Sequence, residues 1–143
     1  MKKNKLVKKL NDKGFSMVEI IIVIAIIAIL AIGVVPQYFK HLENARETTD
    51  IDAYRNIVSA LQVELINSDI ESGTITFADG TGSANDDIEA LLNGVGINLD
   101  NVKMKSDKYE DCVLKFNTTA GVISFSVDVE DLATALGITH ATS

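Results

Sequence analysis

The fold of this chain is decided by the stretch Lys13-Gly14-Phe15-Ser16-Met17-Val18-Glu19 and the uncharged apolar run that follows it at residues 20–35. Residues 15–35 number 21, and as a helix they would span about 31 Å at ~1.5 Å per residue, close to the roughly 30 Å of a bilayer hydrocarbon core. The stretch therefore predicts one transmembrane helix.

The segment ahead of this helix is strongly basic. Residues 1–14 carry six lysines and one aspartate. Because basic flanks stay on the cytoplasmic side, we expect a cytoplasmic N-terminus, with the residues after Pro36 on the far side of the membrane. A secretory signal peptide has a small-residue cleavage site after its apolar stretch. No such site follows here, so we expect the apolar segment to be retained.

Glu19 is an acidic residue at the edge of the apolar segment. A carboxylate well inside a bilayer costs ~2.5–3.5 kcal/mol on insertion scales, so such a side chain is usually excluded from lipid or paired. The residues alone leave two interpretations open. Glu19 either reaches the lipid headgroups or has a partner of opposite charge.

Residues 13–36, with a Lys-rich leader before Gly14-Phe15-Ser16-Met17-Val18-Glu19, resemble the class III signal of type IV pilins and pseudopilins. Ser16 and Met17 stand where the pattern more often has Thr and Leu. The resemblance implies that a prepilin peptidase cuts between Gly14 and Phe15 and methylates the new amine of Phe15. Glu19 would then be the fifth residue of the mature chain.

The resemblance also implies how the mature chain assembles. Glu19 would pair with the Phe15 amine of a neighbouring subunit, which lowers the cost of burying the carboxylate and sets the register of a helical homo-oligomeric filament. The implied partners are the prepilin peptidase, a pilus assembly platform and its ATPase. The chain would lie in the cytoplasmic membrane before assembly and in an extracellular filament afterwards.

The expected fold class is α+β, with a long N-terminal helix packed on a small antiparallel sheet. We expect a leader at residues 1–14, a transmembrane half of the helix at residues 15–36, and a soluble head at residues 37–143 that includes the amphipathic half. Helix signals run from residue 19 to about residue 67 and are interrupted only at Gly33 and Pro36, where we expect a kink.

The amphipathic half of the helix carries an apolar stripe that we expect to meet the sheet. Its members recur at the spacing of one helical face: Tyr54, Ile57, Val58, Leu61 and Leu65. Asp50 and Asp52, near Arg46 and Arg55, are interpreted as ordinary charges on the helix surface.

The rest of the head reads as short elements separated by turns. Strands are expected at residues 74–77, 101–104, 111–117 and 122–129, with a hairpin connection at residues 118–121. Helices are expected at residues 85–93, capped by Ser83 or Asn85, and at residues 130–136, stopped by Gly137. Residues 79–83 are expected to form a loop, and a polar tail containing His140 ends the chain.

Composition limits the function. The formal charge of −7 becomes −12 when the leader, at +5, is removed, so nucleic acid is an improbable direct partner. Four lysines alternate with acidic residues and are interpreted as part of a mixed solvated surface: Lys103, Lys105, Lys108 and Lys115. Cys112 is the single cysteine and is expected to be a buried, unreactive thiol. An intrachain disulfide is therefore excluded, unlike in many proteobacterial pilins.

We expect no catalytic site, cofactor or metal. Residues 79–83 do not match the twelve-residue calcium loop, and the chain has two histidines and no Gly-rich phosphate loop. The favoured function is that of a structural subunit of a type IV pilus, serving in adhesion, twitching motility or related tasks. One alternative is a pseudopilin of a type II secretion or DNA-uptake system. An alternative of another class is a signal-anchored membrane enzyme or binding module.

Overall fold

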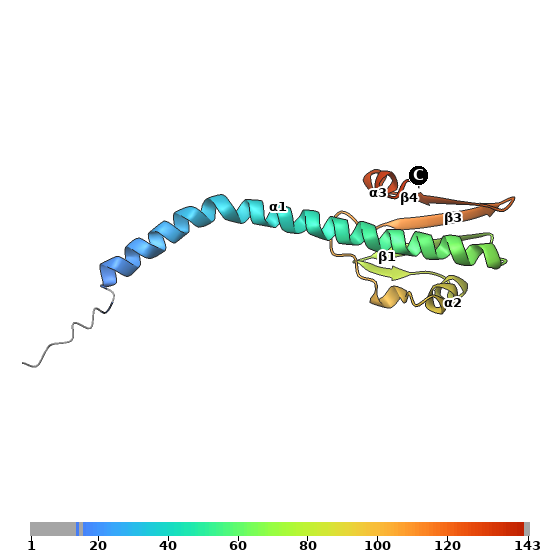
Figure 1. Ribbon diagram of the computed structural model, residues 1–143, viewed down its shortest axis with the longest axis horizontal. Helices are drawn as coiled ribbons and strands as arrows, with labels where there is room; N and C mark the ends of the chain where they lie inside the picture. The colour runs from blue at the N-terminus through green and yellow to red at the C-terminus, as the bar shows by residue number, and fades with distance from the viewer. Residues whose placement is uncertain (1–13, 15, 142–143) are drawn as a thin grey trace, which may run out of the picture. The chain divides into compact units, whose positions relative to one another are not determined.

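The computed structural model describes residues 14 and 16–141 (Figure 1). The chain divides into two compact units, Met1–Lys40 and His41–Ser143, each of which is described by itself. A single long helix, α1 (Met17–Glu64), belongs to both units, and a short 3₁₀ turn, η1 (Leu65–Asn67), ends it. The helix is unbroken at Gly33 and Pro36, both of which lie inside it. The expected kink at these two residues stays a prediction.

The second unit contains a five-stranded sheet with the order β2-β1-β3-β4-β5. Every neighbouring pair is antiparallel except β4 and β5, which run parallel. The expected α+β class with a small, mostly antiparallel sheet is confirmed. The strands have these bounds: β1 (Ser72–Ala78), β2 (Thr81–Ser83), β3 (Val113–Thr119), β4 (Val122–Val127) and β5 (Thr139–His140).

The loop expected at residues 79–83 is instead a tight turn followed by strand β2. Asp79 and Gly80 have φ angles of 49° and 74°, and two successive left-handed residues are the backbone of a two-residue hairpin turn. The same geometry joins β3 to β4, where Ala120 and Gly121 have φ angles of 52° and 78°. The second hairpin was expected, and the first was missed.

The strand expected at residues 101–104 is wrong. Residues Leu99–Asn101 form a 3₁₀ turn, η2, and the only pairing in this region of the described chain is an isolated bridge between Thr81 and Lys103. The side chain of Asn98 accepts a hydrogen bond from the backbone N–H of Asp100. Such a local bond stabilises a turn in competition with a strand. The polar tail also differs from expectation, because it supplies β5.

Two short helices complete the head. α2 (Asp86–Gly94) is capped by Asn85, whose side chain accepts the N–H of Ile88 at 3.0 Å, as one of the two predicted caps. α3 (Glu130–Leu136) has the predicted bounds, and Gly137 ends it with a left-handed φ of 68°.

The core of the head lies between α1 and the inward face of the sheet. Figure 1 shows the C-terminal part of α1 running beside the strands. Every member of the predicted stripe is buried, and Tyr54 packs edge-on against Phe77 of β1 with ring centroids 4.8 Å apart. Cys112 is fully buried, as expected. The sheet and short helices contribute further buried side chains: Ile75, Leu114, Phe116, Phe125, Val127, Ile88, Leu92 and Leu132.

Candidate functional site

The N-terminus of α1 is fixed by a serine cap. The hydroxyl of Ser16 accepts the backbone N–H of Glu19 at 3.2 Å, and its carbonyl accepts the N–H of Ile20 at 3.1 Å. Ser-x-x-Glu is the order of a capping box, in which the serine satisfies a backbone donor that has no partner within the helix. The helix therefore begins at Met17. Gly14, which is exposed and non-helical, lies outside it.

The predicted site residues lie in different surroundings. At Gly14 an added Cβ would meet none of the described residues within 4 Å. Phe15 lies outside the described residues. Glu19 is exposed in the first turn of α1, where a carboxylate favourably opposes the positive end of the helix dipole. Among the residues that the structure describes, none forms an ion pair with Glu19.

The described helix of the first unit presents an exposed apolar surface. Ile29 and Ile32 are 70% and 77% exposed, and none of the side chains described at residues 16–40 is buried. In the described part of the chain, this is the only helix long and apolar enough to cross a membrane. A continuous apolar surface of this kind requires lipid or protein around it. Gly33 and Pro36 are exposed on the same segment.

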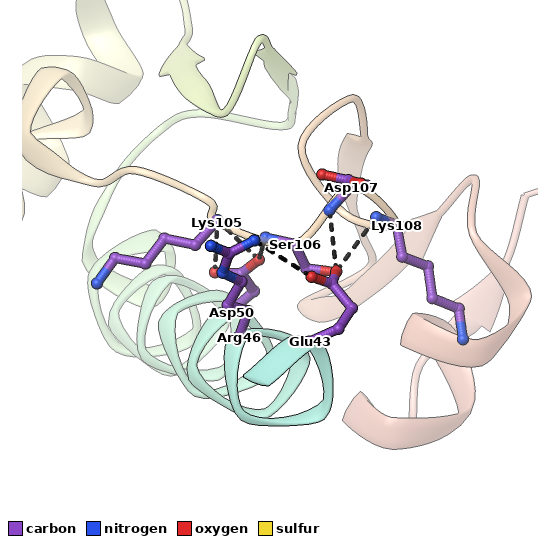
Figure 2. Close-up of polar contacts among 7 residues, drawn as sticks. All are labelled: Glu43, Arg46, Asp50, Lys105, Ser106, Asp107 and Lys108. Atoms are coloured by element: carbon purple, nitrogen blue, oxygen red, sulfur yellow. Dashed lines mark hydrogen bonds and ion pairs between the residues drawn. The ribbon is translucent and has the colours of Figure 1, made fainter. Parts of the chain in front are cut away.

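Asp50 corrects the sequence interpretation, because it is buried rather than a surface charge. Its side chain is 1% exposed and holds the segment after Met104 against α1 (Figure 2). Its Oδ1 accepts the backbone N–H of Lys105 at 3.0 Å, and its Oδ2 accepts those of Lys105 at 2.9 Å and Ser106 at 2.7 Å. These bonds replace the water that a buried carboxylate loses.

Glu43 makes a second link from α1 to the same loop (Figure 2). Its Oε1 accepts the N–H of Asp107 at 3.2 Å, while its Oε2 lies 3.4 Å from Nη1 of Arg46. We call Glu43, Asp50 and residues 105–108 the helix–loop clamp. A sequence signal for it exists, because Asp50 lies four residues before Tyr54 on the buried stripe and Glu43 lies seven residues before Asp50.

The lysines of the head have different environments. Lys108 pairs with Asp131 of α3 at 2.5 Å and lies 5.6 Å from the ring centroid of Tyr109, and the Asp131 contact raises the pKa of Lys108. The other three, Lys103, Lys105 and Lys115, form no ion pair within the described chain. Asp52 pairs with Arg55 at 2.8 Å on the helix surface, as expected.

Cys112 has no reactive environment. Burial, reinforced by a hydrogen bond to the carboxylate of Asp128 at 3.1 Å, raises the pKa of its thiol to about 12. The thiolate is the nucleophilic form of cysteine, so a raised pKa makes the group inert at neutral pH. Over residues 14 and 16–141, no three His, Cys, Asp or Glu side chains are placed to hold a metal ion.

Comparison with known protein families finds a match over the segment that begins α1. Residues 9–35 match the family described as the prokaryotic N-terminal methylation motif. No curated protein and no solved structure matches the chain. The motif supports a precursor of the type IV pilin or pseudopilin type, and its apolar helix fits a membrane-anchored form.

Proposed function

We propose that the chain is the precursor of a structural subunit of a type IV pilus. The observation that carries the proposal is the methylation motif at residues 9–35, which contains the start of helix α1, where the described residues leave the apolar side chains exposed. A helix of this kind can lie first in lipid and then among the helices of neighbouring subunits.

Processing is proposed to occur at the peptide bond between Gly14 and Phe15. The prepilin peptidase would hydrolyse this bond, release residues 1–14, and transfer a methyl group to the new amine of Phe15. Two features support the assignment. Gly14 has no side chain and no described residue within 4 Å of where one would lie, and the Ser16 cap keeps Gly14 outside the helix. A peptidase needs an accessible, non-helical backbone at the bond that it cuts.

Assembly is proposed to use the residues that processing leaves at the new N-terminus. The methylated amine of Phe15 carries a positive charge and would pair with Glu19 of a neighbouring subunit. The pair would set the stagger between subunits, while the apolar surface of residues 17–35 supplies the packing. In this proposal residues 15–36 form the membrane and filament-core segment, residues 37–143 form the head, and Gly33 and Pro36 allow the helix to bend between them.

The decisive experiment is the intact mass of the protein recovered from cells that express it with a prepilin peptidase. We expect the loss of residues 1–14 and the gain of one methyl group. Gly14→Val should retain the full leader, because the added side chain obstructs the peptidase. A wild-type chain that keeps its leader would overturn the proposal and favour a signal-anchored membrane protein.

Electron microscopy of the same cells separates the two filament-forming alternatives. Long surface filaments that contain this chain are expected for a pilus subunit. Processed chain without long filaments would instead assign it to the short filament of a secretion or DNA-uptake system.

A further inference from the structure

The outward face of the sheet carries a shallow hollow of ≈470 Å³. Strand pairing arranges its side chains in two rows that cross the strands. The central row contains Thr74, Lys115, Ser126 and Thr139, in the order β1, β3, β4 and β5. The adjacent row contains Ser72, Asn117 and Ser124.

This hollow is on the opposite side of the sheet from the core. Residues that alternate with the two rows, such as Ile75, Leu114 and Val127, are buried under α1, and successive strand residues point to opposite faces. Gly73, Phe116 and Phe125, which lie between the two rows along their strands, also line the hollow. Its volume is in the range of sites that hold small ligands, roughly 300–1,000 Å³.

The charge of the hollow is the reverse of that of the whole protein. The chain carries a formal charge of −7, yet the ten lining residues include no carboxylate and a single cation, Lys115. Lys115 takes part in none of the ion pairs formed by the described residues. Its ammonium group is therefore available to an anion from outside.

The remaining polar groups are mostly available as well. Thr119 donates its hydroxyl proton to Oδ1 of Asn117 at 2.6 Å, which orients the amide and leaves the two Nδ2 protons as donors. Ser124 donates to the backbone carbonyl of Asn117 at 3.1 Å and keeps its oxygen as an acceptor. Four other hydroxyls make no side-chain hydrogen bond within the described residues: Ser72, Thr74, Ser126 and Thr139.

We propose that this hollow binds an acidic oligosaccharide. The carboxylate of a uronic acid unit would pair with Lys115, and the sugar hydroxyls would exchange hydrogen bonds with the surrounding hydroxyls and with Asn117. Both halves of the ligand are needed, because one cation without the hydroxyl rows selects no particular anion. Nucleic acid fits poorly, since its binding depends on several cations along a phosphate backbone. The proposal does not depend on cleavage or filament assembly.

The test is isothermal titration of the full-length chain in detergent micelles with trigalacturonic acid. Its neutral methyl ester and inorganic phosphate serve as matched probes. We expect the acid to bind and the ester to bind about tenfold more weakly or worse, because the ester loses the charge-assisted hydrogen bond to Lys115. Lys115→Gln should weaken the binding of the acid by a similar factor. Lys103→Gln, which makes the same charge change outside the lining, should leave the Kd unchanged.

Several results would overturn the proposal. Equal binding of acid and ester, or equal effects of Lys115→Gln and Lys103→Gln, would remove the role of Lys115. Phosphate binding as tightly as the sugar would make the hollow a simple anion site. An absence of binding at millimolar acid would reject it outright. Unchanged urea unfolding of Lys115→Gln confirms that the variant is folded, as expected for an exposed side chain.

Discussion

Asp50 is the residue on which the attachment of α1 to the loop at residues 105–108 depends most. Its two oxygens accept three hydrogen bonds from two backbone donors, the N–H groups of Lys105 and Ser106. Ser106 is itself fully buried. A carboxylate is suited to this position because it only accepts hydrogen bonds. An amide of the same size would turn an NH₂ group toward a backbone donor.

We therefore expect Asp50→Asn to lower the free energy of unfolding by about 2–3 kcal/mol, the cost of a lost charged hydrogen bond and an unpaired buried donor. Urea unfolding of the full chain in detergent measures the change, and hydrogen exchange at the amides of Lys105 and Ser106 locates it. The matched control is Asp52→Asn, two residues away in an exposed ion pair, which should change stability by less than about 0.5 kcal/mol. Equal effects of the two variants would contradict the clamp.

At the scale of elements, the sequence predicted best those parts whose signals are local. The stripe from Tyr54 to Leu65 follows the helical period, and Gly137 sits where a left-handed residue must end α3. Strand β5 and the bridge at Lys103 depend on partners distant in the chain, and no local pattern marks them. Asp50 was missed for another reason. It fits the period of the buried stripe, but the sequence alone favours a surface charge at this position because charged residues are seldom buried.

The contact of α2 with β1 is close enough to exclude a side chain at Gly73. A Cβ built there would lie 2.3 Å from Cδ1 of Ile88 and 2.6 Å from Cζ of Phe116. Gly73 pairs with Phe116 of β3, so a shift of either ring or strand would disturb the sheet. The glycine is therefore required by packing rather than by backbone conformation.

Gly73→Ala should destabilise the head by about 1–3 kcal/mol through overpacking. Gly94→Ala is the matched control, because an added Cβ at this last residue of α2 meets nothing within 4 Å. Alanine is a better helix former than glycine, so this variant should be neutral or more stable by up to about 1 kcal/mol. Thermal unfolding of both variants tests whether Gly73→Ala lowers stability while Gly94→Ala does not. A neutral Gly73→Ala would show that Ile88 and Phe116 can move aside without cost.

At the scale of the whole molecule, alkaline pH should weaken the head because its core contains groups that resist ionisation. Burial, together with Asp128, raises the pKa of Cys112 from 9.0 to about 12, and burial also raises the pKa of Tyr54 above its ordinary value of 10.0. The unfolded chain loses these protons first. The stabilisation is therefore complete below pH 9 and falls as the pH rises toward 12, by up to about 1.4 kcal/mol per pH unit for one group.

Between pH 9 and pH 10 the slope should come mainly from Cys112, since the ordinary pKa of Tyr54 lies at the upper end of this interval. Urea unfolding at pH 7, 9 and 10 in the presence of a reductant should show falling stability for the wild type. Cys112→Ala should be less stable at pH 7 because it leaves a cavity, and its stability should change less between pH 9 and 10. Identical slopes for the two proteins would show that the thiol is not the group responsible.

Glu19 links the chemistry of one residue to the proposed behaviour of the assembled protein. Glu19→Val removes the carboxylate from the apolar segment and with it an insertion cost of up to ~2.5–3.5 kcal/mol, so membrane anchoring should be retained or improved. Ser16 still caps the helix through its bond to the backbone N–H of residue 19, which does not involve the replaced side chain. Cleavage after Gly14 should therefore continue. Filaments should be lost, because the amine of Phe15 would have no partner to set the stagger between subunits.

Intact mass, membrane fractionation and electron microscopy of the same cells separate these steps. The conservative variant Glu19→Asp retains the charge on a shorter side chain and should restore part of the filament yield, whereas Glu19→Gln should behave like Glu19→Val. Abundant normal filaments from Glu19→Val would refute the pairing while leaving the processing proposal intact. Loss of cleavage in that variant would instead place Glu19 in recognition by the peptidase, because the carboxylate would then be needed before any subunit contact forms.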